Sequence, residues 1–204
     1  SAKQHETNTR KSIDANGALG SRDAINSTIT SSYANLKGTN IYGRDMIALP
    51  EALADNGFAT NKSGRLLPEA QNILNAHFST GVWTNGYTSI NQINNTLDAI
   101  IKGSFNPALS AAESDRLLGQ LYFLRALYYF DIVRVYAYIP GAVVASQDRG
   151  GVPLLLNGIA TSGDALAFKP SRSPQADVYK QIITDLTAAN SKLLVSSVSS
   201  TANK

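Results

Sequence analysis

The chain has 204 residues, of which 43% are hydrophobic and 16% are charged; this is the composition of a folded protein with one sizeable core, and it excludes a disordered chain. The net charge of +3 is small and the basic residues are scattered, so the sequence predicts no nucleic-acid partner. The absence of cysteine excludes disulfides, zinc–thiolate sites and cysteine nucleophiles.

The distribution of apolar residues predicts no membrane-spanning helix, because no stretch approaches the roughly 18 to 20 apolar residues that such a helix needs. Residues 1–20 are polar and contain no signal-peptide core. We therefore expect residues 1–20 to be a loosely ordered polar leader and residues 21–204 to be a folded domain. Asn, Ser and Thr outnumber Lys and Glu, which favours an exported protein.

Two helices are predicted in the first quarter of the chain. The first follows Ser21, a residue type that caps helix N-termini, and ends before Gly38, a type that closes helices. The second is short and spans residues 44–53, where Pro50 argues against a single long helix. The segments 55–57 and 60–64 are then rich in turn-forming residues, so we expect a long exposed loop.

The segment 82–102, closed by Gly103, predicts a third helix. Its inward stripe is spaced by 4, 3, 4, 3 and 4 residues and consists of Trp83, Tyr87, Ile90, Asn94, Leu97 and Ile101. Asn94 is the polar member of this stripe and needs hydrogen-bond partners if it is buried.

The longest predicted helix runs from Ser110 to Tyr136. Apolar residues cover nearly its whole circumference in the second half, so we expect it to pack between other helices. Polar and charged residues exclude a membrane span, namely Arg116, Gln120, Arg125, Asp131 and Arg134. Asp131 and Arg134, three residues apart, are expected to form an ion pair.

A connection rich in Gly and Pro, residues 137–171, separates this helix from the last one. A connection of this length inside a compact domain is usually functional or packed as a lid. The last helix is predicted to begin with Ser173 as N-cap and Pro174 at the first helical position. Its predicted buried stripe is Val178, Ile182, Leu186, Ala189 and Leu193.

The fold class that follows is all-α with long irregular loops. The two candidate strands, residues 141–145 and 152–156, are short and flanked by helix- and strand-breaking residues. The helices have helix–turn–helix spacing, which is typical of a repeat-like scaffold.

Several segments, taken together and in this order, resemble the N-terminal signature of the SusD/RagB family. They are Ala24-Ile-Asn-Ser-Thr-Ile-Thr-Ser-Ser-Tyr33, Trp83-x-x-x-Tyr87-x-x-Ile90-x-x-x-Asn94, Phe123-Leu-Arg-Ala-Leu-Tyr-Tyr-Phe130, Val133-Arg-Val-Tyr136, Val152-Pro-Leu154, Arg172-Ser-Pro174 and Val178-Tyr-Lys-Gln-Ile-Ile-Thr-Asp-Leu186. The chain departs from the family after Tyr136, where the family usually has Gly and then quickly the Val-Pro-Leu turn. The family is also much longer, so the resemblance is to its N-terminal part only.

The resemblance implies a tetratricopeptide-like helical scaffold, an α/α superhelix, on the surface of a bacterial outer membrane. It implies a lipoprotein whose only membrane contact is a lipidated N-terminal cysteine that this chain lacks, and a SusC-like TonB-dependent transporter as partner. It implies capture of an oligosaccharide or polysaccharide with no catalysis and no cofactor. The alternatives are a tetratricopeptide-like protein–protein interaction module without a glycan ligand and, third, a small glycosidase.

Most residues that carry the resemblance are expected to build the scaffold. They are Trp83, Tyr87, Asn94, Arg125 and Tyr129. Trp83 is a residue type on which sugars stack, but its position at the head of an apolar stripe favours core packing. Burying Asn94 or Arg125 unpaired costs about 1–3 kcal/mol, so we expect both to bind loop carbonyls or carboxylates.

Ligand-binding candidates therefore lie in the loops. The planar polar groups that sugar hydroxyls prefer are offered by Asp55, Asn56, Asn61 and Arg65, although a solvated turn is the alternative for each of them. The segment 147–150 is a candidate transporter-facing surface.

Metal and hydrolase sites are not supported by the pattern of residues. His5 and His77 are far apart in the sequence and have no ligand-spaced neighbours. Glycoside hydrolysis needs two carboxylates about 5–10 Å apart across a cleft, whereas Glu51 and Asp55, at i and i+4, are expected to face solvent.

Overall fold

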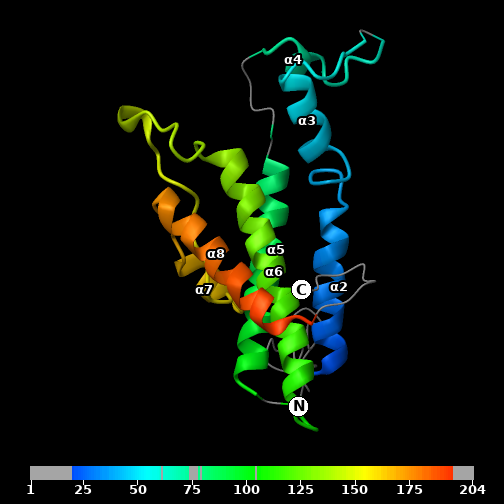
Figure 1. Ribbon diagram of the computed structural model, residues 1–204, viewed down its shortest axis with the longest axis vertical. Helices are drawn as coiled ribbons and strands as arrows, with labels where there is room; N and C mark the ends of the chain where they lie inside the picture. Colours follow the sequence, from blue (N-terminus) through cyan, green and yellow to red (C-terminus); the bar gives the residue numbers. More distant parts are fainter. Residues whose placement is uncertain (1–19, 61, 74–77, 79, 104, 195–204) are drawn as a thin grey trace, which may run out of the picture.

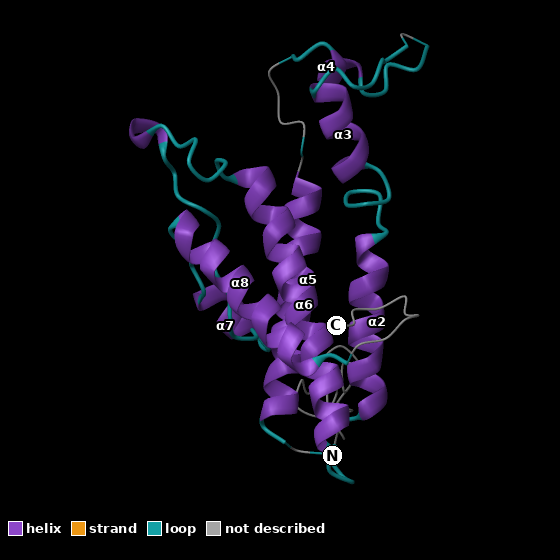
Figure 2. Ribbon diagram, in the orientation of Figure 1, coloured by secondary structure: helices purple, strands orange, loops and turns teal. Residues whose placement is uncertain are grey.

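The computed structural model describes residues 20–60, 62–73, 78, 80–103 and 105–194. Their helices are α2 (Arg22–Leu36), α3 (Asp45–Leu53), α4 (Leu67–Ala70), α5 (Thr80–Ile101), α6 (Ala111–Tyr136), α7 (Ser162–Ala167) and α8 (Gln175–Lys192), with a 3₁₀ turn at Ala145–Gln147. Within these ranges no residue is in a strand (Figure 2), so the predicted all-α fold is confirmed. None of the described helices is long and apolar enough to cross a membrane.

Helix α6 is the centre of the molecule, and α2, α5 and α8 all pack against it (Figure 1). Its buried side chains cover most of the circumference of the helix, except the face of Phe130 and Arg134, and include Leu117, Leu121, Leu124, Tyr128, Ile132 and Val133. Burying one large apolar side chain stabilises a fold by about 1.5–3 kcal/mol. The predicted packing of this helix between others is confirmed, and α6 is the element on which the rest of the core is assembled.

The predicted N-cap of α2 is confirmed, and a serine caps α6 in the same way. Ser21 Oγ accepts a hydrogen bond from the Ala24 amide at 3.1 Å, and Ser110 Oγ accepts one from the Glu113 amide at 3.2 Å. These bonds satisfy amides that have no partner inside the helix. Arg22, in the first turn of α2, also pairs with Glu113 at 2.8 Å, so the two helix starts are joined.

The prediction that Ser173 caps the last helix is wrong. Helix α8 begins one residue later than expected, with Pro174 at the N-cap and no side-chain cap. Ser173 Oγ instead accepts the Leu154 amide at 3.2 Å, while the Ser173 carbonyl accepts the Gly151 amide at 2.7 Å. The serine therefore ties the long connection to the start of α8 instead of closing the helix.

Two positions of the predicted stripes are exposed, not buried. Ile101 is 63% exposed and Leu186 is 42% exposed, whereas their neighbours Ile100 and Asp185 are 5% and 2% exposed. In α5 the last turn presents Ile100 to the core. In α8 the inward position is taken by Asp185 because a buried arginine of α6 requires a carboxylate there.

A short segment between α2 and α3 is attached to α6 by a buried carboxylate. Asp131 Oδ1 accepts hydrogen bonds from the Tyr42 hydroxyl at 2.8 Å and from Arg134 Nη2 at 2.7 Å, which confirms the predicted Asp131–Arg134 pair. Burial raises the pKa of Asp131, partly offset by these two bonds. Burial, followed by the bond to Asp131, raises the pKa of Tyr42 to about 12, so the tyrosine remains a donor at neutral pH.

The contact between α5 and α6 depends on a glycine. A Cβ added to buried Gly86 would lie 2.5 Å from Ile132 Cδ1, and Ile132 is fully buried. We expect Gly86→Ala to lower the free energy of unfolding by about 1–3 kcal/mol, although Gly→Ala in a helix normally stabilises. Urea denaturation followed by circular dichroism measures the effect.

The control for this substitution is Gly163→Ala, in exposed α7, where the nearest atom to an added Cβ is 3.8 Å away. It should be neutral or stabilise by up to about 1 kcal/mol. Adding Ile132→Val to Gly86→Ala removes Cδ1 and should recover part of the loss. A Gly86→Ala variant as stable as the parent would show that the two helices do not meet this closely.

Candidate functional site

The long connection between α6 and α8 is held against one face of α5. Residues 153–159 belong to no helix or strand, and in the described structure their backbone groups bond to side chains. The Tyr87 hydroxyl donates to the Pro153 carbonyl at 2.8 Å, and Asn91 accepts the Ile159 amide at 2.7 Å. Because Tyr87 and Asn91 are four residues apart, one face of α5 holds both ends of this segment.

Helix α6 contributes to the same attachment through Tyr129. Its hydroxyl accepts the Leu155 amide at 2.6 Å and donates to the Leu155 carbonyl at 2.8 Å, which uses both hydrogen-bonding functions of the group. Asn94 Nδ2 donates to the same carbonyl at 2.8 Å. Burial raises the pKa of Tyr129 to about 12, so the hydroxyl keeps its proton at any physiological pH.

A buried ion pair lies behind this attachment and joins α5, α6 and α8. Arg125 Nε and Nη2 donate to the two oxygens of Asp185, both at 2.7 Å, and Nη1 donates to Asn94 Oδ1 at 2.9 Å. Gln181 donates to the same carboxylate at 2.9 Å. Asn94 and Arg125 thus have partners of the kind that the sequence predicts, a loop carbonyl and a carboxylate. The bidentate geometry fixes the three helices relative to one another.

Four aromatic side chains pack where α5 begins and α6 ends. The ring of Trp83 lies 4.8 Å from that of Tyr87 and 5.2 Å from that of Tyr136, and the ring of Tyr87 lies 6.4 Å from that of Tyr129. The Tyr136 hydroxyl also accepts the Trp83 amide at 3.2 Å. Trp83 is half-buried against the core, a position that suits packing more than stacking on a sugar.

The loop that follows α3 forms the first concave surface, with a volume of about 420 Å³. It is lined by Asp55, Asn56, Gly57, Phe58, Ala59, Leu67, Ala70 and Gln71. Asp55 has a positive φ of 58°, and the amides of Asn56 and Gly57 both bond to the Glu51 carbonyl at 3.0 Å. The loop therefore turns back on the end of α3 and directs its side chains outward.

The structure brings together some of the predicted loop residues and not others. Asp55 and Asn56 line this first concave surface; Arg65 is exposed but does not line it. Asn61, His5 and His77 lie outside the described residues. Glu51 and Asp55 are both exposed, as expected.

Sequence reasoning missed Phe58, which is 92% exposed in the first concave surface. The sequence did contain a signal for this exposure. Phe58 lies in a run of turn-forming residues, so it belongs to no helical stripe that would direct its ring toward the core. An exposed aromatic ring beside Asp55 and Asn56 combines an apolar face with polar groups, as small-molecule sites do.

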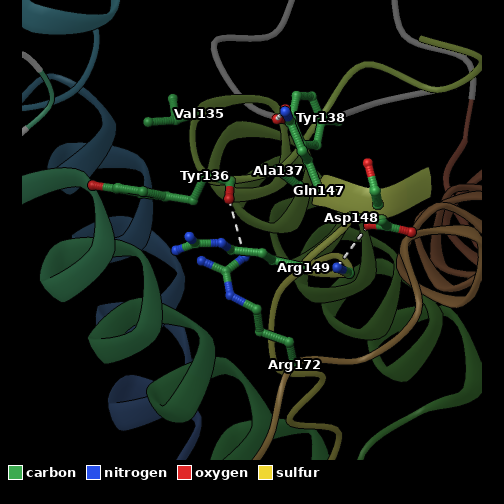
Figure 3. Close-up of a pocket in the computed structure, with 10 residues that line it drawn as sticks. Val135, Tyr136, Ala137, Tyr138, Gln147, Asp148, Arg149 and Arg172 are labelled. Carbon is green, nitrogen blue, oxygen red and sulfur yellow. Dashed lines mark hydrogen bonds between the residues drawn. The ribbon is translucent and has the colours of Figure 1, made fainter. Parts of the chain in front are cut away.

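A second concave surface of about 690 Å³ lies where α6 ends, at the start of the connection (Figure 3). Its lining residues are Val135, Tyr136, Ala137, Tyr138, Ser146, Gln147, Asp148, Arg149, Gly150 and Arg172. Arg172 Nη1 donates to the carbonyls of Tyr136, at 3.0 Å, and Gly151. This surface includes all of the candidate segment 147–150 and is built largely by the residues that separate Tyr136 from Val152.

In the described residues there is no group of three or more His, Cys, Asp or Glu side chains that could hold a metal ion. The described structure is thus an all-helical scaffold that carries concave, polar and aromatic loop surfaces. This arrangement is typical of a binding module.

The chain belongs to the SusD-like family that is described as "Starch-binding associating with outer membrane", which matches residues 8–204. This confirms the family resemblance drawn from the sequence. Among curated proteins, none is similar enough to this chain to count as a match.

Solved structures of SusD-like proteins share the fold. A SusD superfamily protein from Bacteroides thetaiotaomicron has a TM-score of 0.69 at 22% identity over 89% of this chain and 39% of its own. A SusD-like protein from Bacteroides fragilis has a TM-score of 0.67 at 21% identity over 91% and 33%. A laminarin-binding SusD-like protein has a TM-score of 0.61 at 17% identity over 86% and 35%. The chain therefore spans about a third to two fifths of these structures.

The attachment of the connection to α5 can be tested with Asn94→Leu. This change leaves the Leu155 carbonyl and Arg125 Nη1 each without one partner, so we expect a loss of at least about 1–3 kcal/mol in the free energy of unfolding. Hydrogen exchange should show faster exchange of the Leu155 and Ile159 amides. Gln92→Leu, on the exposed face of the same helix, is the control and should leave both amides protected. Unchanged protection in Asn94→Leu would mean that Asn94 does not hold the connection.

Proposed function

We propose that this chain is the helical part of a surface protein that captures glycans for import and performs no chemistry on them. Family membership over residues 8–204 is the observation that carries the proposal. The laminarin-binding relative, which shares the fold, adds support for a carbohydrate ligand. We expect loop residues to determine which glycan is bound, because the residues shared with the family signature pack inside the scaffold.

The first concave surface is the proposed glycan-contacting surface in this chain. The exposed ring of Phe58 suits the apolar face of a pyranose, and the side chains of Asp55 and Asn56 suit its hydroxyls. Both polar residues are held by the turn that closes α3, so they need little further ordering on binding. Asn61 and Arg65 stay ligand-binding candidates from the sequence alone.

The small number of carboxylates among the described lining residues of the two concave surfaces supports a non-catalytic role. Among the described lining residues, the first contains one carboxylate, that of Asp55, and the second contains one, that of Asp148. Glycoside hydrolysis generally uses a facing pair of carboxyl groups. Asp148 Oδ1 is also engaged by the Gly150 amide at 2.8 Å, which suits a turn more than a proton-transfer group.

We also propose that residues 21–204 form the N-terminal helical domain of a longer protein, preceded by a short polar leader to a lipid anchor. The chain spans 39% and 33% of the first two structures that it matches. The face of α8 that points away from α6 carries Ile183, 63% exposed, and Leu186, 42% exposed, which further helices would cover. The missing part would supply the remaining glycan-binding loops.

The glycan proposal predicts that the protein extended to the full length of its gene product binds a soluble glucan such as laminarin or a maltooligosaccharide. The 204-residue chain alone should bind weakly or not at all. In the extended protein, Phe58→Ala should weaken binding by more than about fivefold, which corresponds to about 1 kcal/mol. Isothermal titration calorimetry measures both.

Phe168→Ala is the matched control, because Phe168 is also an exposed phenylalanine, 42% exposed at the end of α7. It should leave the affinity unchanged. Equal losses in the two variants would remove the first concave surface from the glycan site. No binding of any glycan by the extended protein would contradict glycan capture itself.

The proposed partner is a SusC-like TonB-dependent transporter in the bacterial outer membrane. We expect the extended protein, tagged and extracted from its own cell envelope in mild detergent, to co-purify with such a transporter in a stoichiometric complex. Exclusive recovery of soluble cytoplasmic partners would instead favour the alternative, a tetratricopeptide-like interaction module without a glycan ligand. Mass spectrometry of the purified complex distinguishes the two outcomes.

A further inference from the structure

The second concave surface contains two arginine side chains that are distant in the sequence. Arg149 lies in the first half of the connection, just after the 3₁₀ turn, and Arg172 lies just before α8. Figure 3 shows both guanidinium groups directed toward the end of α6, next to Tyr136. The tertiary structure therefore concentrates positive charge in a region where the sequence has only isolated basic residues.

The guanidinium groups retain most of their hydrogen-bonding capacity. Arg172 uses Nη1 for the Tyr136 and Gly151 carbonyls, which leaves its Nε and Nη2 without a protein partner in the described structure. Arg149 is exposed and makes no hydrogen bond or ion pair with any described residue. A planar guanidinium presents paired donors that match a carboxylate or a sulfate.

The carboxylate in the lining does not neutralise this pair. Asp148 Oδ1 accepts the Gly150 amide at 2.8 Å, and the bond closes the turn that carries Arg149. With two arginines and one aspartate, the described lining has a net positive charge of one, so an anionic group that enters it gains attraction from both guanidinium groups.

The remaining wall suits a saccharide. Tyr138 is 40% exposed, and its hydroxyl donates to Gln147 Oε1 at 3.3 Å, which orients the amide of Gln147. Gln175 also donates to the Tyr138 carbonyl, so the backbone under this ring is fixed to the start of α8. A partly exposed ring, an amide and the Ser146 hydroxyl beside two arginines form a mixed apolar and polar lining, and about 690 Å³ is in the size range of small-molecule sites.

We propose that this surface is a second saccharide site, distinct from the loop after α3, and that it binds a carboxylate- or sulfate-bearing sugar through Arg149 and Arg172. The proposal rests on the proposed glycan-binding function and adds acidic sugars to the glycans that the protein is expected to bind. Arg149, Arg172 and the other lining residues named above belong to the described residues, so the 204-residue chain can be used to test the site.

The test is nuclear magnetic resonance titration of the ¹⁵N-labelled 204-residue chain with short oligogalacturonate, oligoguluronate and chondroitin sulfate oligosaccharides. We expect at least one of them to shift the amides of residues 136–150 and the side-chain Nε–Hε signals of Arg149 and Arg172. Methyl esterification of the oligogalacturonate, which removes the charge and keeps the sugar, should abolish the shifts it causes. Raising the ionic strength should weaken binding, because exposed charges are screened by salt.

Arg149→Gln is the decisive variant, because Arg149 makes no bond on which the fold depends. It should weaken binding of the acidic oligosaccharide by about tenfold, as expected for one charge-assisted contact, while Arg149→Lys retains part of the affinity. The matched control, Arg116→Gln, removes the same charge from an exposed position in the first half of α6 and should leave the affinity unchanged. Unchanged thermal denaturation of all three variants verifies that the fold is intact.

Three results would overturn the proposal. The first is the absence of any shift at these residues with every acidic probe. The second is equal binding of the acidic oligosaccharide and its methyl ester. The third is binding of an acidic peptide, but of no saccharide, at these residues, which would make the surface a protein contact. If neutral glucans still bind the extended protein, these results leave the proposed glycan capture intact; loss of all glycan binding by the extended protein contradicts both.

Discussion

The segment 153–159 crosses the helical scaffold without belonging to a helix or strand, so its peptide groups have to find partners elsewhere. A buried peptide group without a hydrogen bond costs about 1–3 kcal/mol, and a segment of this length would accumulate several such losses. Side chains of α5 and α6 remove most of them: Tyr87, Asn91, Asn94 and Tyr129 each bond to a backbone atom of the segment. The long connection is therefore an ordered part of the scaffold.

The buried pair of Arg125 and Asp185 extends this arrangement to α8. Desolvating two charges is costly, and a buried ion pair is weak evidence for stability by itself. Its geometric effect is clearer, since bidentate pairing with Asp185 and a third bond to Asn94 leave one relative position for α5, α6 and α8. The same network thus positions the segment 153–159 together with α6 and α8.

Both concave surfaces depend on this rigid framework, although neither lies inside it. The first is carried by the turn that closes α3, and the residues between α2 and α3 are attached to α6 through Tyr42 and Asp131. The second is formed where α6 ends, and Arg172 bonds the last carbonyl of that helix to the connection. Fixed helices with variable loops at their ends allow ligand specificity to change without altering the core.

Much of this architecture was determined by the sequence alone. The spacing of apolar residues located the long helices, and the Ser21 cap set the start of one of them. The cost of burying Asn94 and Arg125 without partners predicted the polar groups that they bind. These are local or periodic properties, and each follows from hydrogen bonding within one helix or from the 3.6-residue turn. The ordered set of such segments was also sufficient to indicate the family.

Other features were decided only when the chain folded. Asp185 replaces Leu186 on the inward face of α8 because Arg125, 60 residues away, needs a carboxylate. Ser173 does not cap α8, because its Oγ accepts the Leu154 amide instead. Phe58 stays exposed, and Arg149 meets Arg172, through turns whose direction no periodicity specifies. Contacts between residues that are distant in the sequence leave no periodic pattern in it. A polar side chain can bond to several kinds of partner, and the tertiary structure decides which of them comes within hydrogen-bonding distance.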